Sequence, residues 1–143
     1  MSETTQIHPD KVLAYLATDY RLGHTDQDIV LTIGKHSERL AALFADSSVN
    51  CGAFLTAYNS QGTIQSDVAN AQGHTELASK LQELGLQAIV GSGSEEGTEW
   101  PAEKSYFALG LALEPAKAIG THFDQDAIVW VGPDTVPHLI LLR

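Results

Sequence analysis

The sequence has few of the residues on which several common classes of protein depend. Only one of its 143 residues is a cysteine, Cys51, which excludes an internal disulfide and favours a reducing, cytoplasmic location. Lysine and arginine number eight against eighteen aspartates and glutamates, so the formal net charge is -10. Binding to phosphate backbones needs clustered cations, and we therefore expect neither nucleic acid nor an anionic membrane surface as a partner.

Long apolar runs and cofactor motifs are also missing from the sequence. No apolar stretch approaches the ~20 residues of a membrane-spanning helix, and the opening residues MSETTQIHPDK lack both regions of a signal peptide. The six histidines form no His-x3-His pair, so we expect no metal. The glycine-rich stretch 91–97 has no lysine and precedes an expected strand, which indicates a hairpin loop rather than a phosphate-binding loop. No cofactor is expected.

The sequence does contain regular helical and strand patterns, which are typical of an α+β fold in a single domain, residues 1–143. A hydrophobic content of 43% is ordinary for a packed globular protein. Apolar residues at helical spacing predict helices over 8–20, 37–46, 69–84 and 114–123. Alternating or continuous apolar runs predict strands over 28–34, 53–58, 86–90, 105–111, 127–131 and 138–142.

The segment from about 53 to 131 has the order β-α-β-β-α-β, which is the split βαβ of ferredoxin-like folds. An N-terminal helix-strand-helix segment and a C-terminal edge strand extend this mainly antiparallel sheet, with helices expected mainly on one face. Right-handed crossovers place the strand ending at Tyr58 beside the strand starting near Ser105, antiparallel, in the sheet centre. Polar residues from separate stretches then share one sheet edge: Asn59, Asn70, Trp100, Glu103, Ser105 and Gln125.

Glu103 is the strongest candidate among these residues for a chemical role. It stands where a central strand begins, near Trp100 and the hydroxyl of Ser105. A partly buried carboxylate at this position can act as a general base or hold a cationic or hydroxylated ligand. The alternative is structural: the carboxylate accepts hydrogen bonds from loop N–H groups and fixes the glycine-rich loop to the sheet.

The other candidates have the same two interpretations. The amides of Asn59 and Asn70 can bind the donors and acceptors of a ligand, or they can close a turn and cap a helix. Gln125 leaves the same choice open. Trp100 can stack on a planar ligand or anchor a loop. Ser105 lacks the Gly-x-Ser-x-Gly pattern of a hydrolase nucleophile, so we do not expect it to be one.

Four stretches of this edge occur together in one known family. They are FLTAYN at 54–59, Asn70 ahead of a leucine-spaced helix, WPAEKS at 100–105 and FDQDAIVW at 123–130. In these stretches, and over nearly the whole chain, the sequence resembles the bacterial family called domain of unknown function 3293. Because that family has no assigned activity, the resemblance implies a fold and a site location but no chemistry.

The chain departs from the pattern of that family at two positions of the same edge. The family typically has Asn-Pro where this chain has Asn59-Ser60, and Gln-Asn where it has Gln125-Asp126. The first departure removes the rigid exit turn that proline would give. The second implies a more acidic edge.

Three functions fit these observations. In the first, the protein binds a small polar molecule at the edge defined above, with or without chemistry driven by Glu103; this predicts a concave pocket with Glu103 buried. In the second, it is a regulatory or scaffolding module, by analogy with small βαββαβ proteins that trimerise; this predicts an exposed apolar patch and a symmetric homo-oligomer. In the third, it is an acidic partner of a basic protein, which predicts carboxylates gathered on one face.

Overall fold

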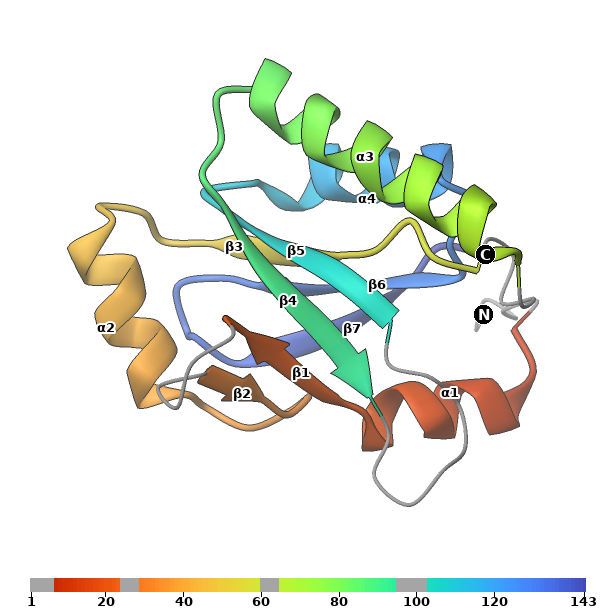
Figure 1. Cartoon of the computed structure of the whole chain (residues 1–143). Helices are drawn as coiled ribbons and strands as arrows, with labels where there is room; N and C mark the ends of the chain where they lie inside the picture. Colours follow the sequence, from red (N-terminus) through yellow and green to blue (C-terminus); the bar gives the residue numbers. More distant parts are fainter. Residues whose placement is uncertain (1–6, 24–28, 60–64, 95–102) are drawn as a thin grey trace.

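The structure is a computed structural model that describes residues 7–23, 29–59, 65–94 and 103–143 (Figure 1). Within these ranges the helices are α1 Pro9–Ala17, α2 Glu38–Asp46, α3 Asp67–Glu83 and α4 Leu113–His122. The strands are β1 Asp19–Leu22, β2 Ile29–Leu31, β3 Gly52–Leu55, β4 Ala88–Ser94, β5 Glu103–Leu109, β6 Ala127–Val131 and β7 Pro137–Leu141. The fold is α+β.

Local sequence signals determine where the helices begin. Ser37 and Ser66 precede α2 and α3, and their hydroxyl oxygens accept hydrogen bonds from the backbone N–H groups of Leu40 and Ala69, each at 3.1 Å. α1 begins at Pro9, whose missing N–H costs nothing at the first helical position. The helices therefore begin close to their predicted positions.

All seven strands form one antiparallel sheet in the order β2-β1-β4-β5-β3-β6-β7. β3 and β5 are neighbours in its middle, with Phe54 opposite Phe107. This confirms the predicted antiparallel pairing of these two strands, although β3 ends at Leu55 and not at Tyr58, and β5 begins at Glu103. β7 is an edge strand, also as predicted.

The predictions are wrong at the end of the first helix. α1 ends at Ala17, and the next residues form β1, a strand inserted between β2 and β4. Tyr20 and Leu22 are buried in β1 whereas Arg21 is exposed, which is the alternation of a strand. The sequence predicts a helix as far as Tyr20 because Tyr20 follows Leu16 at helical spacing. The N-terminal extension is therefore helix-strand-strand-helix.

The predicted loop over 91–97 is also partly wrong, because residues up to Ser94 belong to β4. β4 pairs with β1 there, with Gly91 opposite Leu22. A Cβ atom at Gly91 would collide with the carbonyl oxygen of Arg21. The glycine therefore permits the close approach of two strands, which is one of the uses of glycine inside a sheet. Residues 95–97 lie outside the described residues.

Helices cover both faces of the sheet, and not mainly one face as predicted (Figure 1). α3 and α4 pack on one face, where Leu77, Leu81, Ala116 and Ile119 join Ala53, Leu55, Ala108 and Ile128 in one apolar cluster. α2 packs on the other face, where Leu40 and Phe44 meet a second cluster that includes Phe54, Phe107 and Val129. All four residues of β3 are buried, a pattern that requires cover on both faces but does not say which helices provide it.

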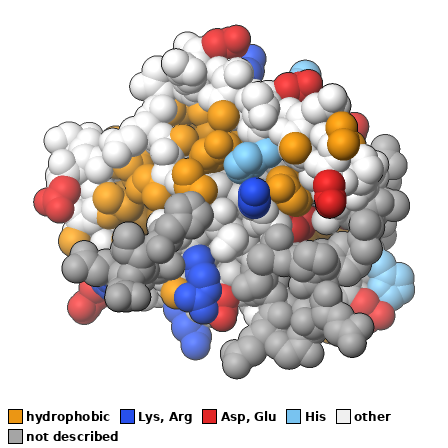
Figure 2. Space-filling view, viewed as in Figure 1, with side chains coloured by type: hydrophobic (Ala, Val, Ile, Leu, Met, Phe, Trp, Pro, Cys, Tyr) orange, Lys and Arg blue, Asp and Glu red, His pale blue; other side chains and the backbone are white. Residues whose placement is uncertain are grey.

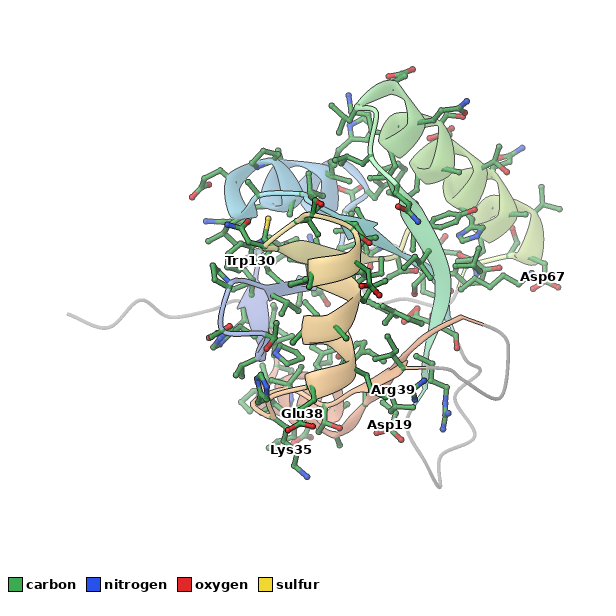
Figure 3. All side chains as sticks on the ribbon, turned by 90° about the vertical axis from the view of Figure 1, so that its left-hand side faces the viewer. Asp19, Lys35, Glu38, Arg39, Asp67 and Trp130 are labelled. Atoms are coloured by element: carbon green, nitrogen blue, oxygen red, sulfur yellow. The ribbon has the colours of Figure 1, made fainter. Side chains whose placement is uncertain are left out.

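The sheet curls toward the face that carries α2. The backbone N–H of Gly34 donates to the carbonyl oxygen of Pro137 at 2.9 Å, and that of Ser37 donates to Thr135 at 3.1 Å. These bonds join the segment after β2 to the start of β7, although β2 and β7 are opposite edges of the sheet. Figure 3 looks onto α2 at this end, with Glu38 and Arg39 on the first turn of the helix. α2 therefore covers one end of a concave face, and α1 lies at the other (Figure 1).

Among the described helices, none combines the length and the hydropathy that crossing a membrane would demand.

Candidate functional site

A cavity of about 510 Å³ lies between α1 and the concave face of the sheet. The helix and the residue after it contribute Lys11, Ala14, Tyr15 and Thr18. The sheet and its loops contribute Tyr20, Phe54, Thr56, Asn59, Gly93, Glu103, Ser105, Gln125, Ala127, Ile128, Val129 and Leu139. Four of the six residues predicted from the sequence thus line one cavity: Asn59, Glu103, Ser105 and Gln125.

Strand register arranges the floor of this cavity in rows. In the inner row, Phe54 is opposite Val129, which is opposite Leu139. Two residues further along the strands, Ser105 and Ala127 line the cavity, and Thr56 follows directly after β3. The outermost row holds Glu103, which is opposite Gly93, with Asn59 and Gln125 just beyond the ends of their strands. The floor therefore changes from apolar to polar toward the rim.

Asn59 and Asn70 hold the rim together through a pair of reciprocal hydrogen bonds. The backbone N–H of Asn59 donates to Oδ1 of Asn70 at 2.8 Å, and Nδ2 of Asn70 donates to Oδ1 of Asn59 at 3.0 Å. Both residues are buried, with 8% and 7% exposure. Asn59 has φ 50, a left-handed conformation that asparagine adopts more readily than most residues. Asn70 is not among the residues that line the cavity, and its side chain makes both of these hydrogen bonds with Asn59, which does line it.

Glu103 receives one hydrogen bond from this amide pair. Nδ2 of Asn59 donates to Oε2 of Glu103 at 3.1 Å. Oε1 has no hydrogen-bond partner among the described residues. Burial raises the pKa of Glu103 above its ordinary value, and the hydrogen bond from Asn59 counteracts this only in part. A partly buried carboxylate with one unoccupied oxygen therefore faces the cavity.

The side chains of Ser105 and Gln125 donate hydrogen bonds to backbone carbonyl oxygens. The hydroxyl of Ser105 donates to the carbonyl oxygen of Glu103 at 3.1 Å. Nε2 of Gln125 donates to the carbonyl oxygen of Tyr58 at 3.0 Å, and its Oε1 has no partner among the described residues. Both side chains line the cavity, and the amide oxygen of Gln125 is a second unoccupied acceptor there. The remaining candidate, Trp100, lies outside the described residues.

Asp126 anchors α1 over the cavity. It is buried, with 6% exposure, and accepts hydrogen bonds from Nζ of Lys11 at 3.3 Å, the hydroxyl of Tyr15 at 3.3 Å and Nε of Arg143 at 2.6 Å. Burial alone would raise its pKa, but the hydrogen bonds from Arg143 and Lys11 outweigh burial and lower it. The acidic group that Asp126 adds to this edge is therefore compensated by two cations.

The tyrosines on the helix side are held in their neutral form. Burial, and after it the negative charges of Asp126 and Glu103, raise the pKa of Tyr15. Burial also raises the pKa of Tyr20, whose hydroxyl donates to the carbonyl oxygen of Tyr15 at 2.8 Å. The charge of Glu103 thus contributes to the raised pKa of Tyr15 across the cavity.

Sequence reasoning missed the side of the cavity that α1 provides. Lys11 and Tyr15 are four residues apart, a spacing that puts them on one helical face, but no pattern in the sequence says that this face meets Asp126, which is 111 residues from Tyr15. Phe54 and Val129 lie in two of the predicted apolar strands, 53–58 and 127–131, but the strand pattern does not indicate that they line a cavity. Among the described residues, no group of three or more histidine, cysteine or acidic side chains is arranged to hold a metal.

Comparison with known proteins assigns a family. The sequence profile of the family described as "Protein of unknown function (DUF3293)" matches residues 55–128, which include all six candidate residues and exclude α1. No curated protein and no solved structure matches the chain. The match covers more than half of the chain and confirms the resemblance seen in the sequence: this protein belongs to the DUF3293 family.

Proposed function

We propose that the protein binds a small polar molecule in the cavity beneath α1, with Glu103 as the principal polar contact. The observation that carries this proposal is a partly buried carboxylate that faces a cavity of about 510 Å³ and whose Oε1 accepts no hydrogen bond from any described residue. Ligand sites in proteins have volumes of roughly 300–1,000 Å³ and mostly apolar walls with a few convergent polar groups. The cavity agrees with that description in both respects.

The same carboxyl group is the one that we propose for any reaction. A general acid or base works best when its pKa lies near the working pH. Burial moves the pKa of Glu103 upward, toward that range, whereas the cations at Asp126 move the pKa of that residue away from it. Glu103 is therefore the catalytic candidate and Asp126 is not.

A thermal-shift screen against a metabolite library tests the binding proposal. We expect at least one compound to raise the Tm of the wild-type protein and to lose most of that effect on Glu103→Gln. The matched control is Glu76→Gln, which removes the same charge from an exposed position on α3, away from the cavity lining. If no compound stabilises the wild type, or if Glu103→Gln responds as the wild type does, the proposal fails.

The alternative, a symmetric oligomer, rests on an apolar surface. Hydrophobic side chains gather between the α3 and α2 sides of the molecule (Figure 2). Val90 on β4 is 37% exposed and Val30 on β2 is 40% exposed. Both project from the sheet face opposite the cavity. Gel filtration of the wild type and of Val90→Asp decides this case: an oligomer that dissociates in the variant supports the alternative, and a wild-type monomer excludes it.

The description of residues 53–131 as ferredoxin-like and the location in the cytoplasm are also proposals. The strand order β4-β5-β3-β6, with α3 and α4 on one face, supports the first. The second is supported by the lone Cys51, which has no cysteine to pair with in the chain.

A further inference from the structure

We infer that the ligand is an amphipathic amine whose protonated amino group pairs with Glu103 and whose apolar part lies beneath α1 against Phe54, Val129 and Leu139. This inference rests on the proposed function and adds to it the chemical class of the ligand. Three features of the cavity carry it: the distribution of charge, the order of the rows on the sheet, and the space beside Glu103.

The first feature is that Glu103, a carboxylate that lines the cavity, has no ion pair with any described lysine, arginine or histidine. Its hydrogen-bond partner, Asn59, is neutral. The cation in the cavity wall, Lys11, contacts Asp126 at 3.3 Å, and Arg143 contacts the same carboxylate at 2.6 Å. A hydroxyl group would leave the charge of Glu103 buried without compensation, whereas an ammonium group supplies both the charge and a charge-assisted hydrogen bond.

The second feature is the apolar inner row. Phe54, Val129 and Leu139 are neighbours across three strands, and Phe54 is also opposite Phe107. Phe107 is four residues from Glu103 on β5, and at about 3.3 Å per residue the inner row is roughly 13 Å from the rim. If a purely polar molecule bound at Glu103, the apolar side chains of the inner row would remain in contact with water. An extended ligand with an apolar tail covers it.

The third feature is the space beside the carboxylate. Gly93 is opposite Glu103 on the neighbouring strand. A Cβ atom at Gly93 would meet its nearest neighbours, in Thr18 and Tyr20, at 3.6–3.8 Å, which is ordinary van der Waals contact. A Cβ atom therefore fits here, and Gly93, which has none, lines the cavity beside Glu103 and leaves that space for a head group.

The experiment varies the head group and the tail independently. Binding of n-hexylamine, 1-hexanol and hexanoate is measured by calorimetry at neutral pH, followed by n-butylamine and n-octylamine. We expect hexylamine to bind more than about tenfold more tightly than hexanol, since a hydrogen bond to a charged group contributes ~1.5–3 kcal/mol, and hexanoate to bind least. Each added methylene should improve the affinity about fourfold, which corresponds to ~0.8 kcal/mol.

Variants then assign each end of the ligand to its contact. Glu103→Gln should remove the preference for amine over alcohol. Leu139→Ser should reduce the gain in affinity that each added methylene brings. Leu141→Ser, on the same face of β7 but outside the cavity lining, is the matched control and should leave both unchanged. Gly93→Leu should fold and should lose hexylamine binding, because the new side chain occupies the space beside Glu103.

The possible outcomes separate this inference from the proposed function. If hexanol or hexanoate binds as tightly as hexylamine, or if Glu103→Gln keeps the amine preference, the charge assignment is overturned. If no amine binds while a library compound of another class stabilises the wild type but not Glu103→Gln, the inference is wrong and the proposed function stands. If no compound of any class binds, both fail.

Discussion

At the scale of single residues, the chain gives its two cavity-side carboxylates opposite environments. Glu103 has a neutral amide as its partner, and burial raises its pKa. Burial also acts on Asp126, but the hydrogen bonds from Arg143 and Lys11 outweigh it and lower the pKa. The hydrogen-bond partners of each carboxyl group, in addition to its burial, decide the direction in which its pKa moves.

The raised pKa of Glu103 predicts a stability that falls as pH rises. The folded state binds the Glu103 proton more tightly than the unfolded state, so stability is lost as pH rises from the unfolded pKa through the folded pKa. We therefore expect Glu103→Gln to be more stable than the wild type at pH 7, with a difference that shrinks as the pH falls toward ~4. Urea unfolding between pH 4 and 8 measures this. A variant that is less stable than the wild type at pH 7 would show that the ionised carboxylate stabilises the fold.

Asp126→Asn should behave in the opposite way. Its folded pKa is lowered, so Asp126 stabilises the protein above its unfolded pKa, and that contribution disappears as the pH falls through the folded pKa. We expect a loss of about 1–2 kcal/mol at pH 7, because Lys11 and Arg143 are partly exposed and lose only part of their interaction. The same urea series should show the gap between variant and wild type closing in acid. A loss that does not depend on pH would assign the effect to packing instead of charge.

At the scale of elements, α1 is attached to the fold in an unusual way. The structure describes the whole of α1, and none of its residues is buried. Its described polar attachments are the bonds that Lys11 and Tyr15 make with Asp126, and the bond from Tyr20 to the Tyr15 carbonyl. α3, by contrast, buries Leu77 and Leu81 in the core. A helix that covers a cavity and buries no side chain opens at a lower free energy than one that fills a core.

Hydrogen exchange measures that difference directly. We expect the amides of α1 to exchange at least about tenfold faster than the central amides of α3, since a gap of 1.4 kcal/mol in opening free energy corresponds to tenfold. Asp126→Asn should accelerate exchange in α1 and leave α3 nearly unchanged, and a ligand bound in the cavity should slow it. Equal protection of the two helices would show that α1 is part of the same cooperative unit as the core.

The difference between α1, which buries no side chain, and the core elements also explains which parts of the fold could be predicted from the sequence. α3 is 17 residues long with leucines at helical spacing, and β3 lies in the continuous apolar run that begins at Ala53. Their existence and the pairing of β3 with β5 therefore follow from periodicity and crossover handedness. β1 has the same length as β3, but its Tyr20 follows Leu16 at helical spacing, so the local pattern assigned β1 to a helix. The meeting of Tyr15 with Asp126 depends on where α1 folds, which no local pattern encodes. The sequence therefore predicted four residues at the rim of the cavity but not the helix that covers it.

At the scale of the whole molecule, acidic side chains outnumber basic ones and the formal net charge is -10. The acidic side chains visible in Figure 2 lie apart from one another on that face, which does not favour a docking surface for a basic protein on that face. Repulsion among distributed charges of one sign lowers the stability of the compact state. Salt screens this repulsion, since the Debye length falls from about 30 Å at 0.01 M to about 10 Å at 0.1 M ionic strength.

We therefore expect the Tm to rise by about 2–4 °C when sodium chloride is raised from ~0.01 to ~0.3 M, which corresponds to roughly 1 kcal/mol for a chain of this size. Chloride is the salt to use, because sulfate would strengthen apolar burial by a separate mechanism. Screening also weakens the attraction of Asp126 for Lys11 and Arg143, so Asp126→Asn, which lacks it, should gain more from salt than the wild type. A wild-type Tm that falls with salt would mean that the local ion pairs outweigh the repulsion of the whole chain, and α1 would then be held more firmly than its exposed residues indicate.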